Sequence, residues 1–150
     1  MTTGIAAPQT AAHAVLTDHR GLVLLVNPAY KNRWHLPGGY LRPGELPSAA
    51  VTREITEELA ITPALPPAPA VIAWAPHGGD RLLLYYAAEL NTEQARSMQI
   101  DGHELVGFRW CAPTALDEWL HPAIADRARL ALEASRRGQT LFLEPHRPSQ

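Results

Sequence analysis

The feature that most constrains the fold is one helix that is bounded by prolines and flanked on both sides by strand-like segments. Residues 47–60 repeat apolar side chains every four positions, at Val51, Ile55 and Leu59, which predicts an amphipathic helix. The helix starts at a proline, a residue that suits the first helical turn. The prolines within residues 63–69 forbid its continuation. A single early helix among strands indicates a mixed sheet with helices on its faces.

The strands are predicted from runs of apolar and β-branched residues. Residues 11–17 and 22–27 flank the turn sequence Asp18-His19-Arg20-Gly21, so we expect them to pair. Residues 70–76 and 81–90 flank a glycine-containing turn at 77–80 and predict a second hairpin. We also expect a strand stub at 34–36, a helical turn at 91–98 capped by Asn91 or Thr92, a strand at 104–111, helices at 113–120 and 122–137 with Gly138 ending the second, and a last strand at 140–143.

Length and composition indicate one folded domain over residues 1–150, with loose ends at about 1–10 and 145–150. The order of the predicted strands and helices indicates the α/β class (α+β type). No apolar run approaches the roughly 20 residues that a membrane span needs. The N-terminus lacks the pattern of a secretory signal, so we expect a cytoplasmic protein. A net charge of −2 gives no basic field for a nucleic acid polymer. The one cysteine, Cys111, is expected to be a core residue at a strand end.

Acidic residues gather beside a glycine-rich loop and on the helix that follows it. At about 100° per residue, Glu57 and Glu58 lie about 60° and 40° on either side of Glu54, so the three carboxylates share one narrow face. That face borders the buried stripe. Carboxylate and carbonyl oxygens suit a hard divalent cation, Mg²⁺ or Mn²⁺, rather than zinc. The alternative is a solvated helix whose acids favour its dipole. The glycines at 38, 39 and 44 favour the metal interpretation, because they allow the backbone to approach a metal or a phosphate closely.

Residues 39–61 resemble the Nudix box, G-x5-E-x7-R-E-U-x-E-E-x-G-U, in which U is a bulky apolar residue. The matching positions are Gly39, Glu45, Arg53, Glu54, Ile55, Glu57, Glu58 and Ile61. Eight of the nine defined positions match, and the exception is Ala60, which replaces a glycine that would ease the turn leaving the helix. The resemblance implies the Nudix fold, a mixed β-sheet sandwiched between helices.

The resemblance also implies an enzyme, a pyrophosphohydrolase that uses Mg²⁺, with Mn²⁺ as a substitute. Water would attack a phosphorus atom of a diphosphate linked to another group, such as a nucleoside triphosphate or a nucleotide sugar. The implied metal ligands are Glu54, Glu57, Glu58 and the carbonyl of Gly38. Arg53 would orient glutamates, and Glu45 would organise the loop by pairing with it. Glu54 and Glu104 both remain candidates for the general base.

The residues that would contact the substrate are less defined than the metal ligands. Arg33, Tyr40 and Gly39 flank the loop and are the candidates for contact with phosphate or a ring, while a structural or solvated role is the alternative for each of the two side chains. A non-catalytic Nudix-fold module that binds a ligand or regulates another process is the main alternative function, and an isomerase of isoprenoid diphosphates is a third. The expected partner is a small-molecule diphosphate. Homodimers are common in the family, although no segment of this sequence identifies an interface.

Overall fold

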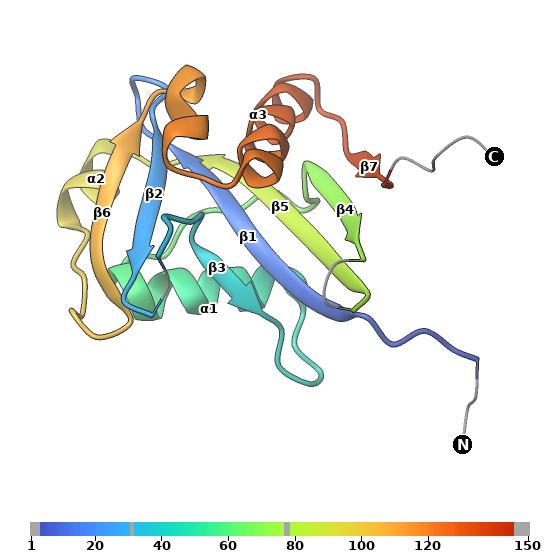
Figure 1. Ribbon diagram of the computed structural model, residues 1–150. Coiled ribbons are helices and arrows are strands. Elements are labelled where there is room, and N and C mark those ends of the chain that lie inside the picture. Colours follow the sequence, from blue (N-terminus) through green and yellow to red (C-terminus); the bar gives the residue numbers. More distant parts are fainter. Residues whose placement is uncertain (1–3, 31, 77–78, 146–150) are drawn as a thin grey trace.

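The computed structural model describes residues 4–30, 32–76 and 79–145 (Figure 1). The predicted turn at 77–80 and the predicted loose ends therefore lie partly outside the described residues. The described elements, in chain order, are β1 (Gln9–Thr17), β2 (Val23–Pro28), β3 (Gly38–Tyr40), α1 (Pro47–Leu59), β4 (Val71–Ala75), β5 (Arg81–Glu89), α2 (Thr92–Ser97), β6 (Leu105–Cys111), the 3₁₀ helix η1 (Pro113–Glu118), α3 (Pro122–Arg136) and β7 (Leu141–Leu143).

These strands form one mixed sheet in the order β6-β2-β1-β5-β4-β7, with β3 paired to β1 outside this path. β1 and β5 run parallel over nine residue pairs, and β4 and β7 run parallel over three, whereas the other neighbouring strands are antiparallel. Helix α1 covers one face of the sheet, and α3 with η1 covers the other (Figure 1). The predicted mixed sheet between helices is thus confirmed.

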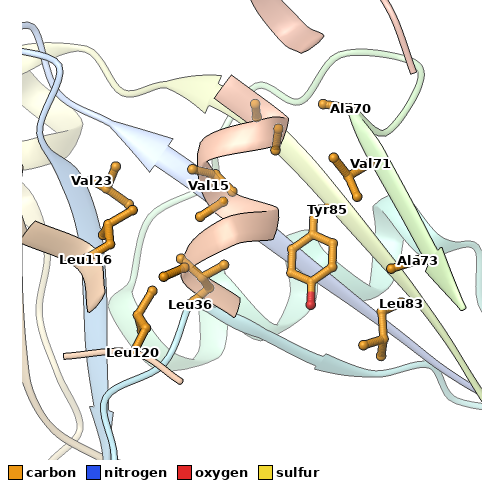
Figure 2. Close-up of a cluster of buried hydrophobic side chains, with 14 of the residues drawn as sticks. Val15, Val23, Leu36, Ala70, Val71, Ala73, Leu83, Tyr85, Leu116 and Leu120 are labelled. Carbon is orange, nitrogen blue, oxygen red and sulfur yellow. The ribbon is translucent and has the colours of Figure 1, made fainter. Parts of the chain in front are cut away.

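Alternating side chains give the sheet a core on each face. On β1, Ala12, Ala14 and Leu16 join Val51, Ile55 and Leu59 of α1 in one cluster of buried residues. The intervening positions of β1 pack beneath the other layer, where Figure 2 shows Val15, Leu116 and Tyr85 around α3. Cys111 is buried at the end of β6, as predicted. None of the described helices has the length and apolar character that crossing a membrane requires.

The glycine-rich loop enters the sheet where β1 and β2 separate. These two strands share only the pair Thr17–Val23 and then diverge (Figure 1). The strand stub predicted at 34–36 is wrong in extent, because His35 makes only an isolated bridge with Val26, and the third strand is β3 at residues 38–40. The strand lies at residues 38–40 rather than 34–36 for a steric reason. Gly38 has no side chain and pairs closely with His13, where a Cβ would lie 2.7 Å from the His13 Cα.

Other predictions hold with changed bounds. β1 begins at Gln9, so two of the ten residues expected to be loose belong to the sheet. The helix predicted at 113–120 is a 3₁₀ helix that ends at Glu118. Asn91 caps α2, and its side chain and that of Gln94 exchange hydrogen bonds with each other's backbone N–H.

Helix α1 ends at Ala60, which adopts a left-handed conformation with φ of 59° and ψ of 31°. Among the described residues it is the sole non-glycine residue with a positive φ. Ala60 is exposed, so the turn is strained by its Cβ rather than by packing. We expect Ala60→Gly to raise the free energy of unfolding by about 0.5 to 1 kcal/mol, because relief of this strain exceeds the added chain entropy. Urea unfolding measures the change, and a lower midpoint for the glycine variant would contradict the strain.

Candidate active site

Three glutamates of α1 meet the glycine-rich loop in different environments. The Glu54 side chain is 18% exposed and lies against the backbone of Gly39, where an added Cβ would be 2.8 Å from Glu54 Oε1. Glu58 is buried at 8% exposure, whereas the Glu57 side chain is 47% exposed. The acidic face therefore begins in solvent and ends at the edge of the core, as the helical spacing predicted.

Arg53 connects the loop to the helix. Its Nε and Nη2 donate to the two carboxylate oxygens of Glu45 at 2.7 and 3.0 Å, a bidentate pair. Its Nη1 donates to Glu54 Oε1 at 3.0 Å and lies 3.5 Å from Glu57 Oε2. The hydrogen bond from Arg53 is the main cause that lowers the pKa of Glu45 to about 2. The pairing of Glu45 with Arg53 that the sequence predicted is present, and it fixes one oxygen of Glu54.

The surroundings of Glu58 disfavour its charged form. Burial, followed by the charges of Glu54 and Glu104, raises the pKa of Glu58 to about 8. Its Oε2 is buried and has no hydrogen-bond partner among the described residues. Asp101 adds a smaller repulsion, and its Oδ1 accepts from the backbone N–H groups of His103, Glu104 and Leu105. This loop before β6 thus directs negative charge toward Glu58.

These residues fit a hard divalent cation. Glu58 offers a buried oxygen without a partner, Arg53 binds only one oxygen of Glu54, and the repulsion around Glu58 is what a positive charge would relieve. Across the part of the chain that the structure describes, no three His, Cys, Asp or Glu side chains are already arranged around one point. The fit therefore rests on the close carboxyls of Glu54 and Glu58, with Glu104 and Asp101 acting at longer range.

A cavity of about 440 Å³ opens beside this acidic edge. Glu58, Gly38 and Gly39 line one part of it, and Tyr40 stands 52% exposed at its wall. Predicted site residues that the fold brings together here are therefore Glu58, the two glycines and Tyr40. Arg33 is exposed and is not among the lining residues, so its predicted contact with substrate stays a prediction.

Sequence reasoning missed several residues of the cavity. His13 lies between His35 and Tyr85, with ring centroids 4.9 and 5.7 Å away. Tyr30 also lines the cavity; burial and then the charges of Glu58, Glu54 and Glu104 raise its pKa. Arg81, His121 and Arg127 complete the polar lining. No motif signals these positions, because they come from four separate parts of the chain: β1, the stretch between β2 and β3, β5, and α3 with its N-cap.

Arg53 gives a first test of the site. We expect Arg53→Lys to lower kcat about 10- to 100-fold, because lysine cannot hold Glu45 and Glu54 through several fixed donors at once. The measurement is steady-state hydrolysis, with circular dichroism to confirm folding. The matched control is Arg137→Lys, an exposed arginine whose pair with Glu133 lies on α3. Equal activity of the two variants would contradict a positioning role for Arg53.

Comparison with known proteins places the chain in a family. The NUDIX domain model matches residues 7–133. A protein of Bacillus subtilis (strain 168), provisionally named as an 8-oxo-dGTP diphosphatase, is 31% identical over 111 residues, which cover 74% of this chain and 71% of that protein.

Solved structures show the same fold. The Ap4A hydrolase binary complex of C. elegans superposes with a TM-score of 0.70 at 24% identity, over 87% of this chain and 98% of that one. The NUDIX domain of Shewanella oneidensis NrtR, complexed with ADP ribose, gives a TM-score of 0.67 at 22% identity, over 90% and 91%. By its box and by these matches, the chain belongs to the NUDIX family, as a member of its pyrophosphohydrolase class.

Proposed function

We propose that this chain hydrolyses the diphosphate linkage of a nucleoside diphosphate derivative in a reaction that needs Mg²⁺, with Mn²⁺ as a substitute. The observation that carries the proposal is Glu58, a buried carboxylate with an unpartnered oxygen and a pKa raised to about 8 beside Glu54 and the glycine-rich loop. A carboxylate held in this way destabilises the protein unless a cation binds, which is typical of a functional site rather than of a structural helix.

Glu54, Glu57 and Glu58, with the carbonyl of Gly38, are the residues that we assign to the cation. When bound, the cation would neutralise the diphosphate oxygens and favour ionisation of the attacking water. Gly38 and Gly39 carry no side chains, which lets the β1 backbone approach Gly38 and the Glu54 carboxyl approach Gly39 closely. Arg53 keeps Glu54 in place through its bonds to Glu45 and Glu54.

The reaction needs a base that takes a proton from water as the oxygen attacks phosphorus and the bridging P–O bond breaks. Glu54 and Glu104 are the candidates. Glu54 is held by a hydrogen bond from Arg53, which limits its movement. Glu104 is exposed, and its charge acts on both Glu58 and Tyr30, so it lies on the same side of the cavity. Separate Glu54→Gln and Glu104→Gln variants would identify the base as the one whose loss removes the acidic limb of the pH–rate profile.

The substrate class follows from the cavity and the relatives together. The relative's name gives 8-oxo-dGTP as one candidate, and the titles of the structural neighbours add Ap4A and ADP ribose. All three contain a nucleoside joined to a diphosphate or longer phosphate chain. The cavity beside Glu58 can receive the group attached to that phosphate chain.

A binding or regulatory module is the alternative function. The NrtR NUDIX domain, whose structure holds ADP ribose, shows that a solved domain of this fold binds such a ligand. This chain retains all four box glutamates and the arginine that positions them, which favours hydrolysis. The isomerase alternative has no added support. The cytoplasmic location, the homodimer and the lack of nucleic acid binding remain predictions.

The test is a substrate panel with the purified chain in Mg²⁺, in Mn²⁺ and in EDTA. The panel contains 8-oxo-dGTP, dGTP, Ap4A, ADP ribose and UDP-glucose, and Glu57→Gln is the control because its side chain is 47% exposed, so we expect its replacement to leave the fold intact. We expect cation-dependent release of a mononucleotide or of pyrophosphate, which the control lacks. Binding of ADP ribose without turnover of any compound would favour the regulatory module instead.

A further inference from the structure

The cavity that begins at the glycine-rich loop ends at two arginines on different elements. Arg81 is the first residue of β5, and Arg127 lies on α3. Arg127 Nη1 donates to the hydroxyl of Tyr85 at 3.3 Å, and the charge of Arg81 acts on the same phenol. Figure 2 shows the Tyr85 hydroxyl directed away from Ala70 and Val71, on the side of the ring toward Leu83. The two guanidinium groups therefore converge around one side chain of the cavity wall.

Neither arginine has an acidic partner among the described residues. Within residues 4–30, 32–76 and 79–145, five arginines make no ion pair with a carboxylate. Arg33 and Arg96 are exposed and Arg109 lies over two tryptophan rings, whereas Arg81 and Arg127 line the cavity. The Nε of Arg81 is moreover buried and makes no hydrogen bond to the described residues. Both side chains are half-buried, and a guanidinium that is partly withdrawn from water without a counter-charge favours the binding of an anionic ligand.

The sheet register separates this pair from the diphosphate end of the cavity. His13 pairs with Gly38 on one side and with Tyr85 on the other, so Tyr85 lies two strands from Gly38, about 10 Å at the usual strand spacing. Arg81 lies four residues further along β5, about 13 Å in the strand direction. One end of the cavity is thus acidic, at Glu58, and the other end is cationic, at Arg81 and Arg127.

We propose that Arg81 and Arg127 form a second anion subsite, which binds a phosphate or carboxylate group on the moiety that is linked to the scissile diphosphate. The inference rests on the proposed function, because the acidic end must hold the diphosphate. Guanidinium groups match both anions through paired hydrogen bonds. A neutral acceptor, such as a base carbonyl, would leave the two charges uncompensated. The substrate is therefore one that carries negative charge at both ends of the cavity.

The test compares ligands that differ by one anionic group. UDP-glucuronate and UDP-glucose differ by a carboxylate, and NADP⁺ and NAD⁺ differ by a phosphate. Binding is measured by calorimetry in Ca²⁺, a hard cation that oxygen ligands also bind, and hydrolysis is measured separately in Mg²⁺. We expect the charged member of one pair to bind about 10- to 100-fold more tightly than its neutral partner. The pair that shows the difference identifies the anion as carboxylate or phosphate.

Arg81→Gln and Arg127→Gln, made separately, should each remove this preference and change the dissociation constant of the neutral member less than about twofold. Arg127→Lys should keep part of the preference, and Arg96→Gln, an exposed arginine on α2, should keep all of it. Two variants are used because Arg127 also holds Tyr85, and Arg81 starts a strand without a comparable bond.

Three outcomes would overturn the subsite. Equal binding of charged and neutral members by the parent protein, or no detectable binding of either up to millimolar concentration, would exclude it. Equal weakening of both members by the arginine variants would assign these side chains to the diphosphate itself. Selective binding of a charged ligand without any hydrolysis would instead contradict the proposed function and leave the subsite intact.

Discussion

The Glu58→Gln variant is expected to be more stable than the parent protein without metal, and to hydrolyse substrate about 10²- to 10³-fold more slowly. Glutamine has nearly the same shape as glutamate but no charge, so it removes both the burial penalty and the repulsion from Glu54 and Glu104. At pH 8 in EDTA we expect a gain of about 2 kcal/mol, or roughly 4 to 8 °C in Tm. Activity falls because the cation loses a charged oxygen ligand.

The stability gain should depend on pH in a defined direction. The folded protein raises the pKa of Glu58 from 4.5 to about 8, so it binds this proton more tightly than the unfolded chain does. Below pH 4.5 the carboxyl is protonated in both states, and the charge has no effect. Between pH 4.5 and 8 the parent protein progressively loses stability as the pH rises. The difference between variant and parent should therefore grow across this window and level off above it.

Thermal unfolding in EDTA at pH 5, 6.5, 8 and 9 measures this dependence, and kinetics in Mg²⁺ measure the activity. Glu57→Gln is the matched control, since its side chain is 47% exposed and should lower activity with little change in Tm. Addition of Mg²⁺ should raise the Tm of the parent more than that of Glu58→Gln. A Glu58→Gln variant that is less stable at pH 8 and unchanged in activity would show that Glu58 is an ordinary structural residue.

The Gly38→Ala variant should be the most destabilised of the glycine variants. Gly38 has a φ of +137°, and a Cβ there would collide with the Ala12 carbonyl and the Cα of His13 on the paired strand. Because both obstacles are backbone atoms, a side-chain rotation cannot relieve them. We expect a loss of about 3 to 5 kcal/mol, or roughly 6 to 20 °C in Tm, with separation of β3 from β1 and loss of hydrolysis.

Gly44→Ala is the control that separates steric collision from backbone strain. Gly44 also has a positive φ, +78°, but nothing lies within 4 Å of an added Cβ. Its replacement should cost only about 1 kcal/mol, from the conformation alone. Urea unfolding of both variants gives the comparison. Similar losses at the two positions would mean that the close approach of Gly38 to β1 contributes little to stability.

The sequence predicts most of the fold because its signals are local. The four-residue repeat of Val51, Ile55 and Leu59 determines the buried face of α1, and the same geometry places Glu58 at the edge of the core. Asn91 provides the cap of α2 within four residues. The strand at β3 is the main exception. β3 can pair with β1 only because β1 and β2 separate after a single residue pair, which is a long-range feature of the fold. In addition, glycines have a low propensity for strands, so the sequence of β3 does not predict one.

The candidate site likewise has one part that the sequence predicts and another part that only the tertiary structure reveals. The residues that the box contributes follow one another along the chain, so their spacing alone predicted that Glu54, Glu57 and Glu58 share one face, and their chemistry predicted the type of cation that suits them. Only the tertiary structure decided that Glu58 is buried without a partner and that Arg81 and Arg127 meet at Tyr85. The burial of Glu58 and the convergence of the two arginines depend on strand order and on helix packing across the sheet, which bring together residues 40 or more positions apart. The spacing of residues within a single segment therefore cannot predict either of them.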